Sequence, residues 1–345
     1  MRVLVTGGCG FLGSHVCEYY VEKGHEVVSY DNMTKHELKR TGFAADLARD
    51  YNWNYLKSLG VKMVKADIRD FEELLDNSQG CDYLVHTAAQ PAMTISWEDP
   101  RLDITTNVLG TFNVLEVARK LKIPVASCAT VHVYGNKINE SLTEKGNRYV
   151  RDPEGIDESH PTLEGSITPL HASKGAGDIY IKTYIDTYKL EAASFRLTGI
   201  YGTRQFGGED HGWVANFSIR TVLSWPITIF GTGRQVRDII YATDVCEAFD
   251  AFYRHRKPGI YNIGGSGQTM ISLLDCIDIL EKIDGRRPQV KFAPDRPSDL
   301  RYFVCDITKA RRHLQWSPRV MPEEGIRLLT DWIRENKGIF GNKES

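Results

Sequence analysis

The stretch that decides the fold is RVLVTGGCGFLGS, residues 2–14. An apolar, β-branched run, Arg2–Thr6, is typical of a buried strand, and Leu12–Lys23 has the spacing of an amphipathic helix. Between them lie Gly7, Gly10 and Gly13 in GxxGxxG spacing. The first glycine permits a tight turn, the second lets a pyrophosphate approach the helix N-terminus, and the third allows close helix–strand packing. The stretch therefore predicts a dinucleotide-binding turn.

An acidic residue follows the next expected strand at the position that such a turn requires. Asp31 ends the run Glu26–Tyr30. A carboxylate at this point hydrogen-bonds the adenosine ribose 2′-hydroxyl and repels a 2′-phosphate, which favours NAD over NADP. An aspartate that only caps a turn is the alternative. Lys35 and Arg40 lie downstream, so NADP stays open.

Short apolar runs alternate with helical patterns through the first 200 residues, with helices expected at segments such as Phe71–Asp76 and Val108–Lys120. This alternation predicts an α/β fold: a Rossmann-like, doubly wound parallel sheet. The expected strands are Arg2–Thr6, Glu26–Tyr30, Lys62–Lys65, Tyr83–His86, Pro124–Ser127 and Ala192–Arg196.

The chain divides into two expected domains. Residues 1–197 form the dinucleotide-binding domain, and residues 198–345, richer in Gly and Pro punctuation, form mainly a smaller C-terminal α/β substrate-binding lobe. Within 236–263 the chain is expected to return to the Rossmann sheet, near Gly259–Ile263. The long polar stretch 139–165 is expected to be a lid or interface loop, with plain disorder as the alternative.

Composition narrows the function classes. The 345 residues carry 43 Lys and Arg against 45 Asp and Glu, a net charge of −2, which argues against nucleic acid or a membrane surface as partner. The seven cysteines are scattered without a CxxC pair, which indicates reduced thiols rather than disulfides or a metal site. With no apolar run of 18 residues, a cytoplasmic protein is expected.

An ordered set of motifs carries a family resemblance. Beyond the glycine turn they are ADIRD (66–70), HTAAQPAM (86–93), TTNVLGTFNVLE (105–116), VHVYG (131–135), ASKGAGD (172–178), FRLTGIYG (195–202), GTGRQVRDIIYATDV (231–245) and YNIGG (261–265). Together they resemble the extended short-chain dehydrogenase/reductase superfamily, in its NAD-dependent epimerase/dehydratase family. The stretches AAQPAMTIS (88–96) and IYGTRQFGGEDHGWV (200–214) are most similar to the group of CDP-tyvelose (CDP-paratose) 2-epimerases.

The resemblance implies NAD as cofactor and assigns residue roles. Thr130 is expected to hydrogen-bond the reacting sugar hydroxyl, with a backbone-packing role as the alternative, and Lys174 to hold the nicotinamide ribose. The residues expected at the cofactor are Gly7, Gly10, Phe11, Leu12, Gly13, Asp31, Asn32, Asp67, Ile68, Ala88, Ala89, Gln90, Asn107 and Lys174.

One catalytic position departs from the family pattern. The family pairs a proton-accepting tyrosine with the lysine four residues later, but here Leu170 precedes Lys174, and leucine cannot exchange a proton. Imidazole titrates near neutral pH, so His132 is the favoured substitute, with a packed histidine as the alternative. His171 is expected to be a surface or capping residue. The expected catalytic set is Thr130, His132 and Lys174.

Arginines are expected to bind the substrate pyrophosphate, because planar guanidinium pairs phosphate oxygens bidentately. Arg234, Arg237 and Arg301 are the candidates, and a solvated charged loop is the alternative. Arg204 and Gln205 are expected to meet the sugar or the nucleobase.

These features predict an NAD-dependent nucleotide-sugar epimerase that acts on a CDP- or UDP-linked sugar through a transient keto-sugar, as a homodimer or higher homo-oligomer by resemblance. An isomerase is favoured over a lyase. A dehydratase or decarboxylase that uses His132 is one alternative, and a non-catalytic nucleotide-sugar-binding protein is another.

Overall fold

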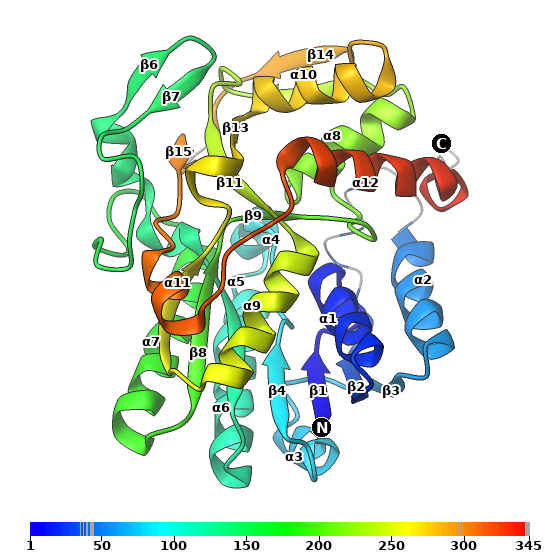
Figure 1. The fold of residues 1–345 in the computed structure, drawn as a ribbon, viewed down its shortest axis with the longest axis vertical. Coiled ribbons are helices and arrows are strands. Elements are labelled where there is room, and N and C mark those ends of the chain that lie inside the picture. Colours follow the sequence, from blue (N-terminus) through cyan, green and yellow to red (C-terminus); the bar gives the residue numbers. More distant parts are fainter. Residues whose placement is uncertain (35, 37, 39–40, 42–44, 297, 342–345) are drawn as a thin grey trace.

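The computed structural model describes residues 1–34, 36, 38, 41, 45–296 and 298–341, so Lys35 and Arg40 lie outside the described residues. A seven-stranded, fully parallel sheet with the strand order β12-β8-β5-β4-β1-β2-β3 forms one lobe, in the lower half of Figure 1. Its strands are β1 (Arg2–Thr6), β2 (Glu26–Asp31), β3 (Lys62–Lys65), β4 (Tyr83–His86), β5 (Val125–Thr130), β8 (Ala192–Leu197) and β12 (Gly259–Ile263). The Rossmann-like α/β fold is confirmed.

The strands differ from the sequence expectation mainly at β5. It was expected over Pro124–Ser127, but it begins after the proline, which lacks a backbone N–H, and runs on to Thr130. Thr130 is thereby placed at the carboxyl end of a central strand, where open α/β sheets bind their ligands. Within 236–263, only β12 joins this sheet.

Helices cover both faces of the sheet (Figure 1). On one face α9 packs against α1 and α11, and on the other α6 packs against α3 and α7. These helices are α1 (Phe11–Glu22), α3 (Phe71–Ser78), α6 (Gly110–Leu121), α7 (Pro169–Tyr188), α9 (Ala242–His255) and α11 (Thr308–Leu314). The remaining helices of this lobe are α2 (Ala45–Ser58), α4 (Met93–Glu98) and α5 (Pro100–Ile104).

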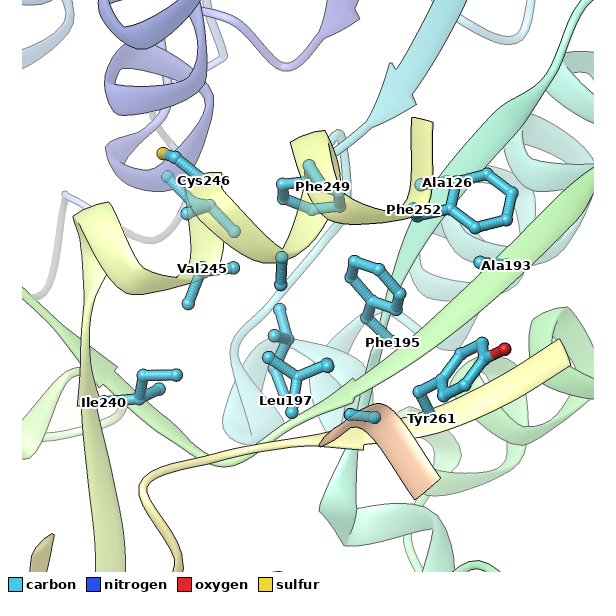
Figure 2. Close-up of a cluster of buried hydrophobic side chains, with 14 of the residues drawn as sticks. Ala126, Ala193, Phe195, Leu197, Ile240, Val245, Cys246, Phe249, Phe252 and Tyr261 are labelled. Carbon is cyan, nitrogen blue, oxygen red and sulfur yellow. The ribbon is translucent and has the colours of Figure 1, made fainter. Parts of the chain in front are cut away.

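Aromatic side chains fill the core under α9. Figure 2 shows Phe195 on β8 beside Phe249 and Phe252 on α9, with Tyr261 on β12 close by. The rings of Phe195 and Phe249 are stacked with their centroids 5.1 Å apart. All four side chains are fully buried, so this cluster fixes how α9 and the edge strand β12 sit on the sheet.

The second lobe is built from short strands and three helices, α8 (Trp213–Val222), α10 (Leu273–Asp284) and α12 (Pro322–Glu335). Strand β11 (Val236–Tyr241) pairs with β9 (Gly199–Tyr201), β13 (Met270–Ser272) and β15 (Tyr302–Phe303), and β10 (Ile227–Phe230) pairs with β14 (Val290–Ala293). Because β9 directly follows β8 and β12 follows α9, the chain crosses between the lobes more than once.

The stretch 139–165 packs against the second lobe. It contains the hairpin of β6 (Thr143–Lys145) and β7 (Arg148–Val150). The backbone N–H of Tyr149 donates to Arg234 O at 3.0 Å, and that of Ile156 donates to Val304 O at 2.9 Å. In the structure this stretch is therefore held to the second lobe by backbone hydrogen bonds, and its role as a lid or interface loop stays a prediction.

Candidate active site

A cleft of about 490 Å³ lies at the carboxyl edge of the parallel sheet, walled on its other side by the second lobe. A smaller pocket of about 90 Å³ shares Gly7 and Gly10 with it and extends toward the end of β2. No residue of 139–165 lines either space within the described part of the chain, so the expected lid does not cover the cleft in this structure.

The glycine turn approaches its neighbours so closely that it has no room for side chains. Gly7 has φ +69°, and a Cβ on it would lie 2.7 Å from the backbone of Ala88. A Cβ on Gly13 would overlap the carbonyl oxygen of Gly7. The N–H of Gly7 donates to Tyr30 O at 2.8 Å, which ties the turn to β2. This geometry leaves the N-terminus of α1 open to an anion such as a pyrophosphate.

The adenosine end of the smaller pocket carries the expected acidic residue. Asp31 lines it and accepts the backbone N–H groups of Cys9 at 3.0 Å and Met33 at 2.7 Å, which hold its carboxylate beside the glycine turn. Asn32 and Ile68 also line this pocket. Its size and its acceptor fit the ribose of a dinucleotide.

Asp67 takes a position behind this pocket. Its carboxylate accepts the Asn32 amide at 2.9 Å and pairs with Arg69 at 2.7 Å. Burial raises its pKa, but the hydrogen bonds from Arg69 and Asn32 outweigh burial and bring the pKa to about 2. A permanently charged Asp67 therefore orients Asn32 and Arg69, which both line the pocket.

A buried amide pair holds the end of β4. Ala88 and Ala89 line the smaller pocket, as does Gln90. Asn107 accepts the backbone N–H of Gln90 at 2.9 Å, and its amide donates to Gln90 O at 3.1 Å. The Gln90 amide donates to the buried Asp103 at 2.9 Å. Asn107 is not among the described lining residues of either space, so its contacts position the backbone around Gln90.

The expected catalytic residues meet on one wall of the cleft. Thr130, His132, Leu170 and Lys174 all line it, as do Phe11 and Leu12 at the start of α1. Thr130 caps the 3₁₀ turn Val131–Tyr134, and its hydroxyl accepts the His132 N–H at 3.2 Å. Lys174 Nζ donates to Cys128 O at 3.5 Å. Burial lowers the pKa of Lys174, so the neutral amine is more favoured at this site than it would be in water.

His132 is a weaker base than the sequence suggests. Burial, followed by the charges of Arg237 and His171, lowers its pKa to about 3, so it is neutral at neutral pH. Its Nδ1 is buried without a hydrogen-bond partner among the described residues. His171 is fully buried and accepts the backbone N–H of Thr168 at 3.0 Å, so the expected surface position is wrong and the expected capping contact is present.

The three candidate arginines separate in space. Arg237 lines the cleft, and its guanidinium donates to Val236 O at 2.8 Å and lies 3.6 Å from Asp299. Arg234 instead pairs with Glu144 of the β6–β7 hairpin, and Arg301 pairs with Asp295 at 2.8 Å. Neither of these two is among the described lining residues, because their turns point them away from the sheet edge.

Arg204 and Gln205 line the cleft, but the guanidinium of Arg204 is already bonded to side chains of α1. It is 5% exposed and donates to Ser14 Oγ at 3.1 Å, and it pairs with Glu18. Gln205 donates its amide to Ile200 O at 3.2 Å, which leaves its buried Oε1 without a partner among the described residues. Gln205 therefore leaves a buried acceptor unpaired at the cleft wall, whereas Arg204 braces the glycine-turn helix.

Two cleft residues, Arg49 and Asn52, carry no motif in the sequence, and a third, Arg296, lies in the stretch 296–301 that the family resemblance already marks as a candidate phosphate contact. Arg49 and Asn52 of α2 each donate to Cys9 O at 3.0 Å and line the cleft beside the glycine turn. Arg296 stacks on Phe230 with its guanidinium 3.8 Å from the ring centroid, and both line the cleft. Arg49 and Asn52 lie outside the motifs of the chain, so only the fold brings them to the site.

Comparison with known proteins identifies the family. The family model described as NAD dependent epimerase/dehydratase family matches residues 3–264. The chain belongs to this family.

Among its relatives in the epimerase/dehydratase family, CDP-paratose 2-epimerase of Salmonella typhi is 35% identical over 96% of this chain and 99% of its own length. A putative UDP-glucose 4-epimerase of Methanocaldococcus jannaschii is 32% identical over 97% and 99%. The solved UDP-glucose 4-epimerase of Thermus thermophilus in complex with NAD is 32% identical with a TM-score of 0.79 over 97% of this chain and 99% of that one.

The chain is thus an enzyme of the epimerase/dehydratase family, with NAD as its cofactor. Two observations show that the residues present fit NAD. Gly7 and Gly13 let the turn pack closely against Ala88 and against itself at the N-terminus of α1, where a pyrophosphate binds, and Asp31 offers the ribose acceptor. In the described residues, no cluster of His, Cys, Asp and Glu is arranged to hold a metal ion, and no helix is both long and apolar enough to cross a membrane.

Proposed function

We propose that this enzyme epimerises a nucleotide sugar through a transient keto-sugar, and that the nucleotide is CDP, with UDP as the alternative. The observation that carries the proposal is the shared cleft, which Thr130, Lys174, the glycine turn and Arg237 all line. The 35% identity to CDP-paratose 2-epimerase over nearly the whole chain supports the CDP-linked substrate.

In this proposal each lobe binds a different ligand. Residues 1–197 hold the dinucleotide, and most of 198–345 holds the sugar nucleotide. Arg237 binds the diphosphate, because it is the one of the three candidate arginines that reaches the cleft in the described structure.

The proton must travel by a route that does not use tyrosine. When bound, NAD supplies the reversible oxidation of a sugar carbinol. Thr130 Oγ1 orients the reacting hydroxyl, and Lys174 Nζ takes its proton and later returns it. Lys174 suits this role better than His132, because burial lowers its pKa and so favours the neutral amine that can take a proton, whereas burial and the charges of Arg237 and His171 leave His132 a weak base.

Product analysis tests the proposal. The enzyme with NAD is incubated with matched CDP-, UDP- and dTDP-sugars in D₂O, and the products are followed by NMR. Epimerisation by oxidation and return predicts an inverted centre whose C–H carries no solvent deuterium. Deuterium on a carbon beside the ketone, or loss of water or CO₂ from the sugar, would contradict epimerisation and indicate dehydratase or decarboxylase chemistry. Tight binding without turnover of any sugar would indicate a binding protein.

A matched pair of lysines on α7 tests the proton route. Lys174→Gln removes the cleft amine, so turnover should fall by about 10²–10⁴. Lys182→Gln removes an exposed lysine paired with Asp186 on the same helix, and its turnover should stay near that of the wild type. Equal turnover in both variants would contradict the role of Lys174.

The assembly and location are also part of the proposal. Apolar side chains on α6 and α7 are exposed, among them Phe112 at 39%, Ile179 at 59% and Tyr180 at 43%, and the Phe112 and Tyr180 rings touch. We propose that a second copy covers this face to form a homodimer, and that the protein, whose cysteines are all free, works in the cytoplasm. Sedimentation of Tyr180→Glu should show a monomer, and an unchanged mass would contradict the interface.

A further inference from the structure

A buried histidine, His171, lies beside His132, which is half-buried and lines the cleft. His171 begins α7 and is fully buried. Its Nδ1 accepts the backbone N–H of Thr168 at 3.0 Å and lies 2.6 Å from the Thr168 hydroxyl. Because a backbone N–H can only donate, this Nδ1 carries no hydrogen. The neutral His171 ring must therefore carry its hydrogen on Nε2.

The unsatisfied atoms of the two rings are complementary. Nε2 of His171 is buried and has no partner among the described residues, and the same is true of Nδ1 of His132. The two rings are neighbours, with centroids 5.5 Å apart and planes at 78°. Two imidazole rings at this centroid separation can join through an N–H···N hydrogen bond of about 3 Å when their nitrogens face each other. One ring offers a buried donor and the other a buried nitrogen that can accept.

We propose that His171 is a positioning residue that donates its Nε2–H to Nδ1 of His132 and thereby fixes His132 as a neutral ring with its hydrogen on Nε2. Since Nδ1 is the buried nitrogen and His132 lines the cleft, Nε2 is the nitrogen available to a ligand. His132 then donates a hydrogen bond into the cleft and accepts none.

The other states of His132 are disfavoured by its surroundings. A hydrogen on Nδ1 would set two N–H groups against each other in a buried space, leaving both unsatisfied. A cationic ring would add a second charge close to Arg237, which lines the same wall from β11. The neutral Nε2–H form satisfies both rings and adds no charge.

This inference rests on the proposed function for its role in turnover. The oxygen of the reacting sugar carbon is a hydroxyl in the substrate and a carbonyl in the keto-sugar, and only a donor can hydrogen-bond both. A preorganised donor aimed at a carbonyl oxygen stabilises the charge that builds on it. His132 therefore polarises the keto-sugar oxygen, and proton transfer stays with Lys174.

Nitrogen NMR on the enzyme with NAD, without any sugar, tests the tautomer. The protein is labelled with ¹⁵N-histidine, and the His132 ring is assigned by comparison with His132→Gln. The expected spectrum shows a protonated Nε2 and a bare Nδ1 on His132. A bare Nε2, a tautomer mixture or a cationic ring would overturn the proposal. Because no turnover is involved, this result stands even if the proposed epimerase activity is not found.

Three variants separate positioning from folding. His171→Leu removes the donor, so His132 should become a tautomer mixture and kcat should fall about tenfold, the scale of one hydrogen bond. His171→Gln keeps a capping acceptor and a donor, so it should restore the single tautomer and most of kcat. Thr168→Val perturbs the same helix start but keeps the backbone N–H, so the tautomer should not change. If His171→Leu is unstable, the Gln variant and the wild-type spectrum still decide the matter.

Discussion

Two arginines of one motif, Arg234 and Arg237, offer a direct test of the cleft. Arg237 lines it, whereas Arg234, three residues earlier, pairs with Glu144 on the surface. Replacing each by glutamine removes one positive charge from the same segment. We expect Arg237→Gln to weaken binding of CDP and UDP and Arg234→Gln to leave it unchanged.

The magnitude follows from the contacts of Arg237. Guanidinium has five N–H donors. One N–H group on each terminal nitrogen donates a hydrogen bond to a backbone carbonyl, Val236 O or Leu300 O. The guanidinium also forms an ion pair with Asp299 at 3.6 Å. The remaining donors leave room for one charge-assisted contact to a phosphate, worth about 1.5–3 kcal/mol. That free energy corresponds to a Kd about 12- to 140-fold higher, at tenfold per 1.4 kcal/mol.

Titration calorimetry with CDP, UDP and NAD measures the effect, and thermal unfolding controls for stability because Arg237→Gln leaves Asp299 without its partner. NAD affinity should be the same in all three proteins. The reasoning fails if Arg237→Gln binds CDP as the wild type does, or if Arg234→Gln weakens it equally. Parallel loss of NAD and CDP would show a folding defect instead of a lost contact.

Three further predictions follow from the site. Asp31→Ala should narrow the preference for NAD over NADP, because the ribose acceptor is gone; calorimetry that finds the wild type binding NADP more tightly would refute the assignment. His132 should stay neutral from pH 8 down to pH 5 in an NMR titration, because burial, Arg237 and His171 lower its pKa to about 3. Arg237→Gln should raise the His132 pKa, because removing a neighbouring positive charge favours the cation. A titration midpoint near 6.5 in the wild type would show that the His132 ring is solvated like a free imidazole. Gly13→Ala should abolish NAD binding and lower the unfolding temperature, because its Cβ would overlap Gly7 O; normal NAD affinity in a folded variant would show that the turn can adjust.

Much of the cofactor side could be predicted from the sequence because its signals are local. The GxxGxxG turn needs only a strand before it and a helix after it, and Asp31 needs only to end the next strand. The strands β1, β3 and β4 have the bounds expected from their apolar runs. Short-range hydrophobic patterning fixes such elements before any long-range contact forms.

The substrate side depended on contacts between distant segments. Arg234 and Arg237 sit in one motif, yet only β11 pairing and the turn before it send one into the cleft and the other to the hairpin. The sequence by itself showed that a tyrosine is missing at Leu170 and that His132 is nearby in the chain. Only the tertiary structure brought His132 beside His171 and close to the charge of Arg237, and these surroundings rather than residue type decide whether an imidazole acts as a base or as a neutral donor.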